Sequence, residues 1–185
     1  YKYFWTGRNE NKGLGVLTKK SDFFVDESHN KDLINFLPIA SDNLKLLGVW
    51  SFNHRASKFG DGVSGKTIDA INFYKDWFGD NNERCIVAGD FNNSIIWDKK
   101  GNDNNFNNIN DHFEDLGFVS NYHKLKDEGF GKESYATFFH TKKESKKYHI
   151  DYIYSKNLNP LELKVGSYTE WISYSDHSPL IAELG

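Results

Sequence analysis

Three short motifs along the chain bring together carboxylates, an amide and an imidazole. Each motif lies at the end of, or inside, an apolar strand-like run, so each can direct a polar side chain toward a common point. Hard oxygen ligands beside an imidazole suit a divalent cation and metal-assisted attack on a phosphate ester. The three motifs are Gly89-Asp90-Phe91-Asn92, His149-Ile150-Asp151-Tyr152 and Ser175-Asp176-His177-Ser178-Pro179.

The first motif follows a wholly apolar run, Cys85 to Ala88, which predicts a strand buried on both faces. In an extended chain Asp90 and Asn92 lie on the same face, and Phe91 turns into the core. Asp90 could orient an attacking water or take its proton. Asn92 could donate to a phosphoryl oxygen without adding negative charge. A simple strand-end turn would also account for an Asp and an Asn at these positions.

Asp151 lies in an otherwise apolar strand-like segment, where an unpaired buried carboxylate would be costly. A histidine is its natural partner, because the carboxylate fixes the imidazole tautomer and stabilises the imidazolium. His149 is two residues away, and strand alternation places it on the same face. His177 is the alternative partner, and it would link two motifs that are distant in the sequence.

Asp176 and His177 are adjacent, so their side chains point in different directions. One of them could bind a metal while the other reaches a substrate, although a turn aspartate beside a surface histidine would also fit this motif alone. Pro179 stiffens the exit into the last strand. Asn53 follows another predicted strand and could present an amide to a phosphate, with a structural turn as an equal alternative.

The pattern of apolar residues predicts an α/β protein with mixed sheets, because strands alternate with helices in the first half and strands dominate the second. Asn92 to Asn110 is predicted to be a long surface loop, and Gly7 to Asn11 a polar loop. Most Trp and Tyr residues are expected to belong to the core or its rim and not to a base-stacking platform. The predicted strands are 13–17, 44–50, 85–88, 135–139, 148–154, 161–168 and 179–184. The first predicted helix is capped at Ser64 or Thr67, ends at Gly79 and has on one face Ile68, Ile71, Tyr74 and Phe78. The second predicted helix ends at Gly117 and has on one face Phe106, Ile109, Phe113 and Leu116.

The composition suits one domain of 185 residues with a formal net charge of −3, which does not indicate a general polyanion binder. The lysine run from Lys142 to Lys147 is expected to be a solvated loop. Cys85 is the single cysteine, so no internal disulfide can form, and we expect a cytoplasmic protein. No apolar stretch approaches the roughly 20 residues that cross a bilayer.

Taken together, the motifs resemble those of the endonuclease/exonuclease/phosphatase superfamily, which includes DNase I-like and exonuclease III-like enzymes. The resemblance covers nearly the whole chain. It rests on Lys12 to Leu17, Trp50 to Asn53 and the three motifs described first, which occur in the family's order. It implies a four-layer α-β-β-α sandwich, in which two mixed sheets are flanked by helices.

The resemblance also implies roles for individual residues. Asp90 would activate water, and Asn92 would support the phosphoryl transition state together with His177. Asp151 would orient His177, while Asp176 and Asp90 would hold Mg²⁺ or Mn²⁺. Asn53 would contact the substrate. The implied activity is divalent-metal-dependent phosphodiester hydrolysis by a nuclease that acts on DNA, with nucleic acid as the partner.

The chain departs from the family pattern at its start. In the family, a strand that carries an asparagine and then a strand that carries a metal-binding glutamate come before the Gly-x-Gly strand. Nothing in residues 1–12 matches these two strands. Glu10 is too close to the Gly-x-Gly strand to be assigned as the metal-binding glutamate. The chain also contains no methionine. We therefore expect residues 1–185 to form a single domain that lacks its N-terminal strands, and these residues alone to bind metal weakly and to have little activity. A phosphoinositide phosphatase, a sphingomyelinase-type phosphoesterase and a non-catalytic domain of the same fold remain alternatives.

Overall fold

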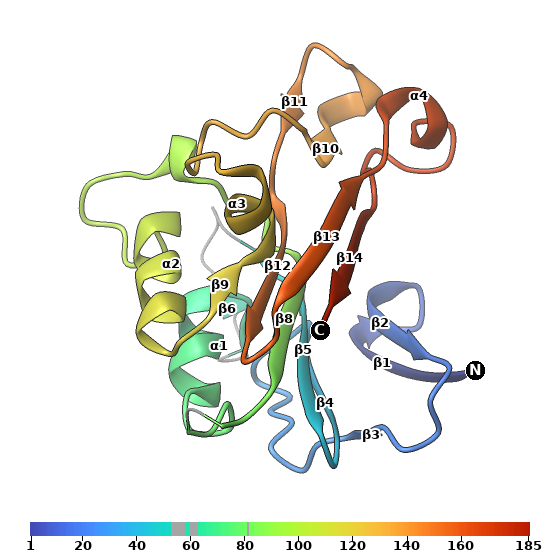
Figure 1. The fold of residues 1–185 in the computed structure, drawn as a ribbon, viewed down its shortest axis with the longest axis vertical. Coiled ribbons are helices and arrows are strands. Elements are labelled where there is room, and N and C mark those ends of the chain that lie inside the picture. The colour runs from blue at the N-terminus through green and yellow to red at the C-terminus, as the bar shows by residue number, and fades with distance from the viewer. Residues whose placement is uncertain (53–57, 60–62, 81) are drawn as a thin grey trace.

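The computed structural model describes residues 1–52, 58–59, 63–80 and 82–185. Asn53 lies outside the described residues. A mixed six-stranded sheet forms the centre of the molecule (Figure 1). Its strand order is β3 (Phe24–Val25), β4 (Phe36–Ser41), β5 (Leu44–Trp50), β8 (Cys85–Asp90), β12 (Asp151–Lys156) and β9 (Val119–Ser120). The pairing of β5 with β8 is parallel and the other pairings are antiparallel.

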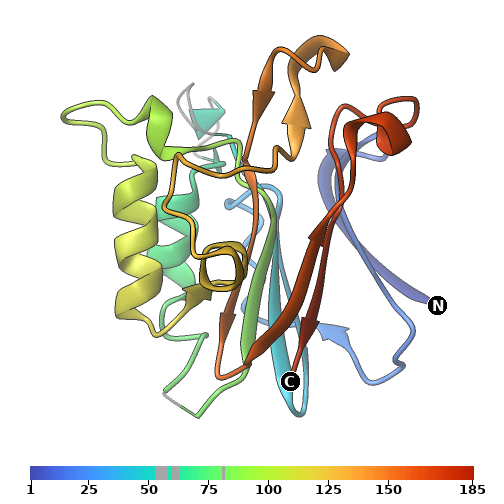
Figure 2. The ribbon, with the colours of Figure 1, turned by 45° about the horizontal axis from the view of Figure 1, so that its top comes forward.

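Helices cover one face of this sheet, and two antiparallel hairpins lie on the other, as Figure 2 shows. The helical side holds α1 (Thr67–Tyr74), α2 (Phe106–Asp115) and α3 (Asn121–Lys126). The hairpins are β1 (Lys2–Asn9) with β2 (Lys12–Thr18), and β13 (Pro160–Val165) with β14 (Leu180–Leu184). The expected layered α/β class is confirmed, although the second sheet consists of two separate hairpins in the described part of the chain.

Short elements complete the fold near one end of the central strands. The hairpin of β10 with β11 and the four-residue helix α4 extend beyond the sheet at the top of Figure 1. The bounds of the remaining elements are β6 Lys58–Phe59, β7 Val63–Ser64, β10 Phe138–Phe139, β11 Lys147–Tyr148, α4 Tyr168–Trp171, and two 3₁₀ turns at Ile95–Trp97 and His140–Lys142. No helix in the described ranges is long and apolar enough to span a membrane.

The main core lies between the sheet and the helices, and aromatic rings fill most of it. Phe113 stacks on Tyr154 with ring centroids 4.5 Å apart, and Phe106 stacks on Tyr152 at 4.6 Å. The ring of Phe91 is fully buried among them, as its place in the strand pattern predicts. Offset and edge-on contacts of this kind stabilise a core beyond the burial of area. They fix the positions of β8 and β12, the two central strands that carry Asp90 and Asp151.

Several predicted elements differ from the structure. Gly7 to Asn9 belong to β1 and not to a loop, because the first strand continues to the turn that precedes β2. Helix α1 starts after Lys66, which provides no side-chain cap, so neither Ser64 nor Thr67 acts as one. β8 is buried on one face only, since the hairpins leave its other face half-exposed. The second half also contains α3 and α4, whose short lengths give no helical period.

Candidate active site

Asp90 and Asp151 stand opposite each other on adjacent central strands. β8 and β12 are antiparallel, and their register pairs Asp90 with Asp151. β8 can approach its parallel neighbour closely at this point because residue 89 is glycine. A Cβ atom on Gly89, whose φ is +143°, would lie 1.9 Å from the Val49 carbonyl oxygen. Only glycine fits at position 89, and the residue that follows it, Asp90, carries its carboxylate at the end of β8.

The carboxyl of Asp90 has an unusual pKa. Burial and the negative charge of Asp151 raise the pKa of Asp90 to about 7. The hydrogen bond from the Asn92 backbone and the charge of the nearby His177 both lower the pKa of Asp90, but they do not cancel the increase. A carboxyl that titrates near neutral pH can accept a proton from water, as a general base must.

Asn92 orients the Asp90 carboxylate. The Asn92 backbone N–H donates to Asp90 Oδ1 at 2.8 Å, and Asn92 Nδ2 donates to Asp90 Oδ2 at 2.9 Å. Asn92 Nδ2 also donates to the Ser51 carbonyl oxygen at 2.9 Å. Asn92 has φ of 47°, a left-handed conformation that asparagine tolerates better than most residues. Both donors of the amide are therefore used within the protein, which favours an orienting role over the expected donation to a phosphoryl oxygen.

His177 is the partner of Asp151. His177 Nδ1 lies 2.9 Å from Asp151 Oδ2, so Nδ1 carries the proton that the carboxylate accepts. The second nitrogen, Nε2, is left to act on a substrate. Burial opposes the charged imidazolium, but the hydrogen bond and charge of Asp151 outweigh it and raise the pKa of His177. Of the two partners that the sequence allowed for Asp151, the structure selects His177.

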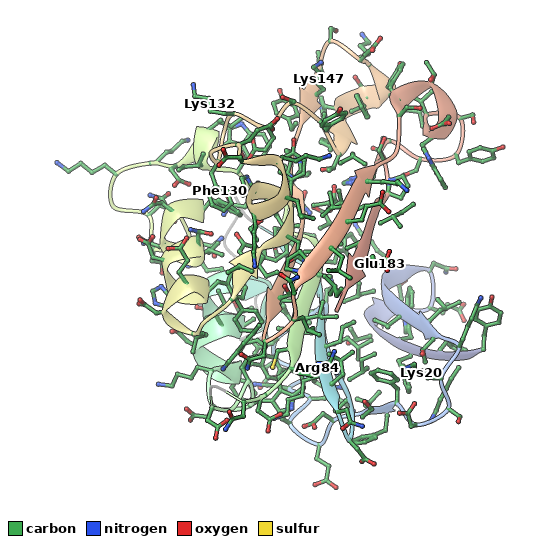
Figure 3. All side chains as sticks on the ribbon, viewed as in Figure 1. Lys20, Arg84, Phe130, Lys132, Lys147 and Glu183 are labelled. Atoms are coloured by element: carbon green, nitrogen blue, oxygen red, sulfur yellow. The ribbon has the colours of Figure 1, made fainter. Side chains whose placement is uncertain are left out.

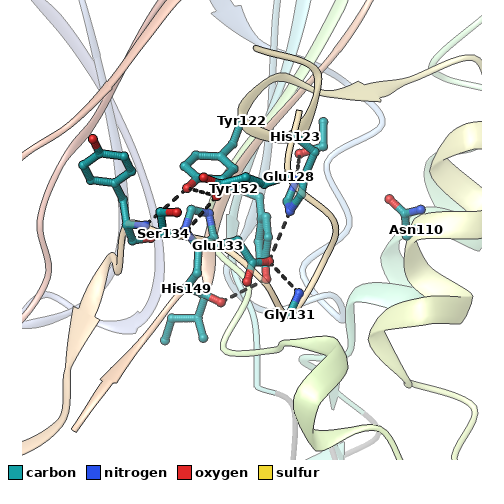
Figure 4. A network of polar contacts seen from close by, with 12 residues as sticks. Asn110, Tyr122, His123, Glu128, Gly131, Glu133, Ser134, His149 and Tyr152 are labelled. Carbon is teal, nitrogen blue, oxygen red and sulfur yellow. Dashed lines mark hydrogen bonds and ion pairs between the residues drawn. The ribbon is translucent and has the colours of Figure 1, made fainter. Parts of the chain in front are cut away.

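His149 belongs to a different network, which Figure 4 shows. Its Nδ1 lies 2.7 Å from the Tyr135 carbonyl oxygen, and its ring contacts Tyr122 and Tyr152. The strand alternation predicted for 148–154 fails here, because β12 begins only at Asp151. His123, next to this ring, is paired with Glu133 at 3.1 Å and is not an isolated surface histidine. These contacts hold the segment before β10 against the core.

Thr137 joins the start of β12 to the segment that carries His177, and the sequence patterns gave no sign of it. Thr137 Oγ1 accepts the backbone N–H groups of Ile150 at 3.0 Å and Asp151 at 3.1 Å. The Thr137 carbonyl oxygen accepts the Ser178 N–H at 2.8 Å. The Thr137 side chain is fully buried. One threonine thereby fixes the start of β12 and the segment that presents His177 relative to each other.

Among the described residues, one group of three acidic or imidazole side chains is close enough to share an ion. Asp90, Asp151 and His177 each offer a ligand atom, and these atoms lie within 4.8 Å of one another. Two carboxylates and an imidazole are a donor set that divalent cations accept. The residues therefore fit a divalent ion.

Asp176 is outside this close group, although it neighbours His177. Its negative charge is the smallest of the effects that raise the pKa of Asp90. Its backbone carbonyl oxygen accepts the Phe139 N–H at 2.8 Å. The structure thus brings together Asp90, Asn92, Asp151 and His177 and places Asp176 at their edge. Asn53 falls outside the described residues.

Three solved structures have the same fold as this chain. The 3′ phosphatase NExo from Neisseria, bound to a product DNA hairpin, matches all of this chain and 79% of its own, with a TM-score of 0.70 and 14% identity. The 3′-5′ exonuclease NExo from Neisseria meningitidis matches 88% of this chain and 70% of its own, with a TM-score of 0.62 and 16% identity. An endonuclease/exonuclease/phosphatase family protein from Leptotrichia buccalis matches 81% of this chain and 52% of its own, with a TM-score of 0.51 and 16% identity.

These likenesses confirm the expected fold, that of the endonuclease/exonuclease/phosphatase proteins. No protein-family model and no curated protein matches the chain. At 14–16% identity the comparison extends to the fold and not to the activity. The chemistry must be argued from the site itself.

Proposed function

We propose that this protein is a divalent-metal-dependent phosphodiester hydrolase, a nuclease whose substrate is DNA. The observation that supports this most is the position of the Asp151–His177 pair within ligand distance of Asp90, whose pKa is about 7. The site combines a base that can activate water with an imidazole that can act on a phosphate.

Asp90 is the proposed general base. Its pKa of about 7 allows the carboxylate form to be populated at neutral pH and still to take a proton from an attacking water. The two hydrogen bonds from Asn92 hold both carboxylate oxygens in place. Asn92 is therefore a positioning residue whose effect on the transition state passes through Asp90.

His177 is the proposed contact to the scissile phosphate. The bond from Nδ1 to Asp151 fixes the ring and favours its charged form, so Nε2–H can donate to a phosphoryl oxygen as negative charge develops there. Asp151 holds the imidazole in this tautomer. The contact of Nδ1 with Asp151 supports this division of roles, in which the two nitrogens of one histidine act separately.

Asp90 and Asp176 are the proposed holders of Mg²⁺ or Mn²⁺, and Asp151 lies close enough to share in the site. When bound, such an ion supplies Lewis-acid stabilisation of phosphoryl charge and lowers the pKa of a coordinated water. Asp90 would then lose its proton at lower pH. Asp90 orients the attacking water, and His177, held by Asp151, contacts the phosphate of the substrate.

Nucleic acid is favoured as the substrate because a structure of the same fold, the Neisseria 3′ phosphatase, is bound to a DNA hairpin. A substrate panel tests the proposal. It contains a 5′-labelled single-stranded and duplex oligonucleotide, methyl p-nitrophenyl phosphate, a phosphoinositide and sphingomyelin, each with Mg²⁺ or Mn²⁺ and with EDTA. Metal-dependent cleavage of the oligonucleotides supports the proposal. Hydrolysis of a lipid substrate alone, or activity that survives EDTA, would refute it.

A further inference from the structure

Beside the site, aromatic rings from three separate segments form a continuous surface, here called the aromatic wall, that consists of Trp97, Tyr148 and Phe138. The ring centroids of Trp97 and Tyr148 are 5.0 Å apart, and those of Tyr148 and Phe138 are 6.3 Å apart. The Trp97 side chain remains 37% exposed. Phe138 and Tyr148 are half-buried, so all three residues of the wall are partly open to solvent.

The wall lines one side of a cleft of about 1090 Å³. Small-molecule sites usually occupy roughly 300–1,000 Å³, so this cleft has room for more than one nucleotide unit. Asn92 and Ile150, neighbours of the two site carboxylates, also line it. At its inner end the Phe138 ring centroid lies 4.7 Å from that of His177. The cleft therefore lies next to the proposed catalytic residues, of which Asp151 and His177 line a second, smaller hollow of about 400 Å³.

The loop that directly follows Trp97 carries two lysines, Lys99 and Lys100, and is held in place by hydrogen bonds. Asp98 accepts the N–H groups of Phe106 at 2.7 Å and Asn107 at 2.9 Å, which anchors the loop to the start of α2. Asn105 closes a ring with the backbone of Lys99, accepting its N–H at 2.9 Å and donating to its carbonyl oxygen at 2.7 Å. Lys99 and Lys100 both line the cleft. Since the loop is fixed at both ends, it can present these lysines without first becoming ordered.

Aromatic faces beside a basic loop match the chemistry of an unpaired nucleobase attached to a phosphodiester chain. A base inside a duplex has both faces covered by its neighbours, so only a base that has left the stack can lie on such a wall. Base–aromatic stacking accepts any base, and lysines follow the backbone. The wall cannot clamp a base between Trp97 and Tyr148, because their rings touch each other. It offers one open surface.

We propose that the aromatic wall binds an unpaired nucleobase next to the scissile phosphate, so that the substrate is a single strand or a frayed end and not an intact duplex. This rests on the proposed function and specifies its substrate class. The sequence had placed the Trp and Tyr residues mostly in the core or its rim. Trp97 and Tyr148, which meet from two distant segments, are rim residues of this kind, and the proposal adds a stacking role to them.

Binding without turnover tests the wall directly. A single-stranded oligonucleotide with a central 2-aminopurine is titrated in EDTA, with fluorescence as the readout. Trp97→Ala and Tyr148→Ala should each weaken binding by about 10-fold, the scale of one lost stacking contact. Trp97→Phe and Tyr148→Phe should retain most of the affinity. Tyr3→Ala, a change at a 74% exposed tyrosine on β1, is the matched control and should bind as the wild type does.

The charge of the loop is tested in the same assay. The double variant Lys99→Gln, Lys100→Gln should reduce the salt dependence of binding by about 0.7 in the log–log slope for each lysine lost. The control removes Lys19 and Lys20 in the same way. Lys20 lies by the β1–β2 hairpin, away from the cleft (Figure 3).

Three results would overturn the inference: equal affinity in the alanine variants, equal affinity for an intact duplex, or Trp97-dependent binding of phosphoinositide vesicles in place of the oligonucleotide. Thermal melting of each variant confirms that it is folded. Hydrolysis of methyl p-nitrophenyl phosphate separates the two proposals. A wild type that binds the strand through Trp97 but hydrolyses no phosphodiester contradicts the function and supports the wall. Hydrolysis with binding that does not depend on Trp97 contradicts only the wall.

Discussion

Asp90 and Asp151 face each other across antiparallel strands, and the negative charge of Asp151 adds to the larger effect of burial on the pKa of Asp90. Together these two effects raise the pKa of Asp90 from 3.8 to about 7. Between these two pH values the folded protein binds a proton that the unfolded chain has released. The free energy of unfolding must therefore fall as the pH rises from about 4 through 7. The raised pKa of His177 extends the same trend above pH 6.5.

The variant Asp90→Asn should remove most of this pH dependence. It keeps the shape of the side chain but cannot ionise, so in EDTA it should be more stable than the wild type at pH 8. The difference in Tm between variant and wild type should grow between pH 5 and pH 8 by at least about 2 °C. A difference in Tm between the two proteins that stays constant from pH 5 to pH 8 would contradict the assigned environment of Asp90.

Metal binding should follow the same titration. A divalent ion must displace the proton of Asp90, so Mg²⁺ or Mn²⁺ should raise Tm more at pH 8 than at pH 5.5. Asp90→Asn should abolish the stabilisation, which differential scanning fluorimetry can measure. Asp176→Asn should weaken it if Asp176 holds the ion as proposed. An unchanged metal effect in Asp176→Asn, with loss in Asp151→Asn, would instead locate the ion in the close group of Asp90, Asp151 and His177.

The variant Asp151→Asn should lower kcat by about 10²- to 10⁴-fold, because an amide at this position no longer enforces the Nδ1–H tautomer of His177. KM should change little, since Asp151 is proposed to act through His177. The raised pKa of His177 should also fall toward its ordinary value, which an NMR titration of the imidazole reports. A wild-type pH profile with normal kcat would show that the pair has no role in the reaction.

Thr137 offers a prediction about support of the site. Thr137→Val removes the oxygen that accepts two buried N–H groups while keeping the volume of the side chain. It should destabilise the protein by about 1–3 kcal/mol, the usual cost of an unsatisfied buried donor. Thr137→Ser keeps the oxygen and is the matched control. Denaturant melts that give equal stability for Val and Ser variants would show that the double hydrogen bond is unimportant.

The sequence predicted those elements that have a clear hydrophobic period. The strand 44–50 has the observed bounds of β5, and Phe106, Ile109 and Phe113 lie on the buried face of α2 as expected. The helix α3, by contrast, is six residues long and reads Asn-Tyr-His-Lys-Leu-Lys, which carries no period. Most of its stability comes from packing that a local pattern does not contain.

The site was predicted from the same logic, and its misses have a common cause. We predicted that Asp90, Asp151 and His177 lie near one point because each was expected at the end of a strand or inside one, and polar residues at strand ends meet at an edge of the sheet. The choice between His149 and His177 could not be made from spacing, since it depends on where the segment before β14 crosses β12. Thr137 and the Trp97–Tyr148 contact were missed because both join segments that are distant in the sequence.

The central claim is that Asp90 and His177 carry out metal-dependent cleavage of a phosphodiester chain. The most direct measurement is the single-turnover cleavage rate of a 5′-labelled single-stranded oligonucleotide with Mg²⁺, for the wild type, Asp90→Ala, His177→Ala and the control Tyr3→Ala, with folding checked by circular dichroism. The proposal predicts that both site variants lose at least about 10²-fold in rate while the control does not change. Equal rates in all four proteins, or no cleavage by the wild type, would contradict it.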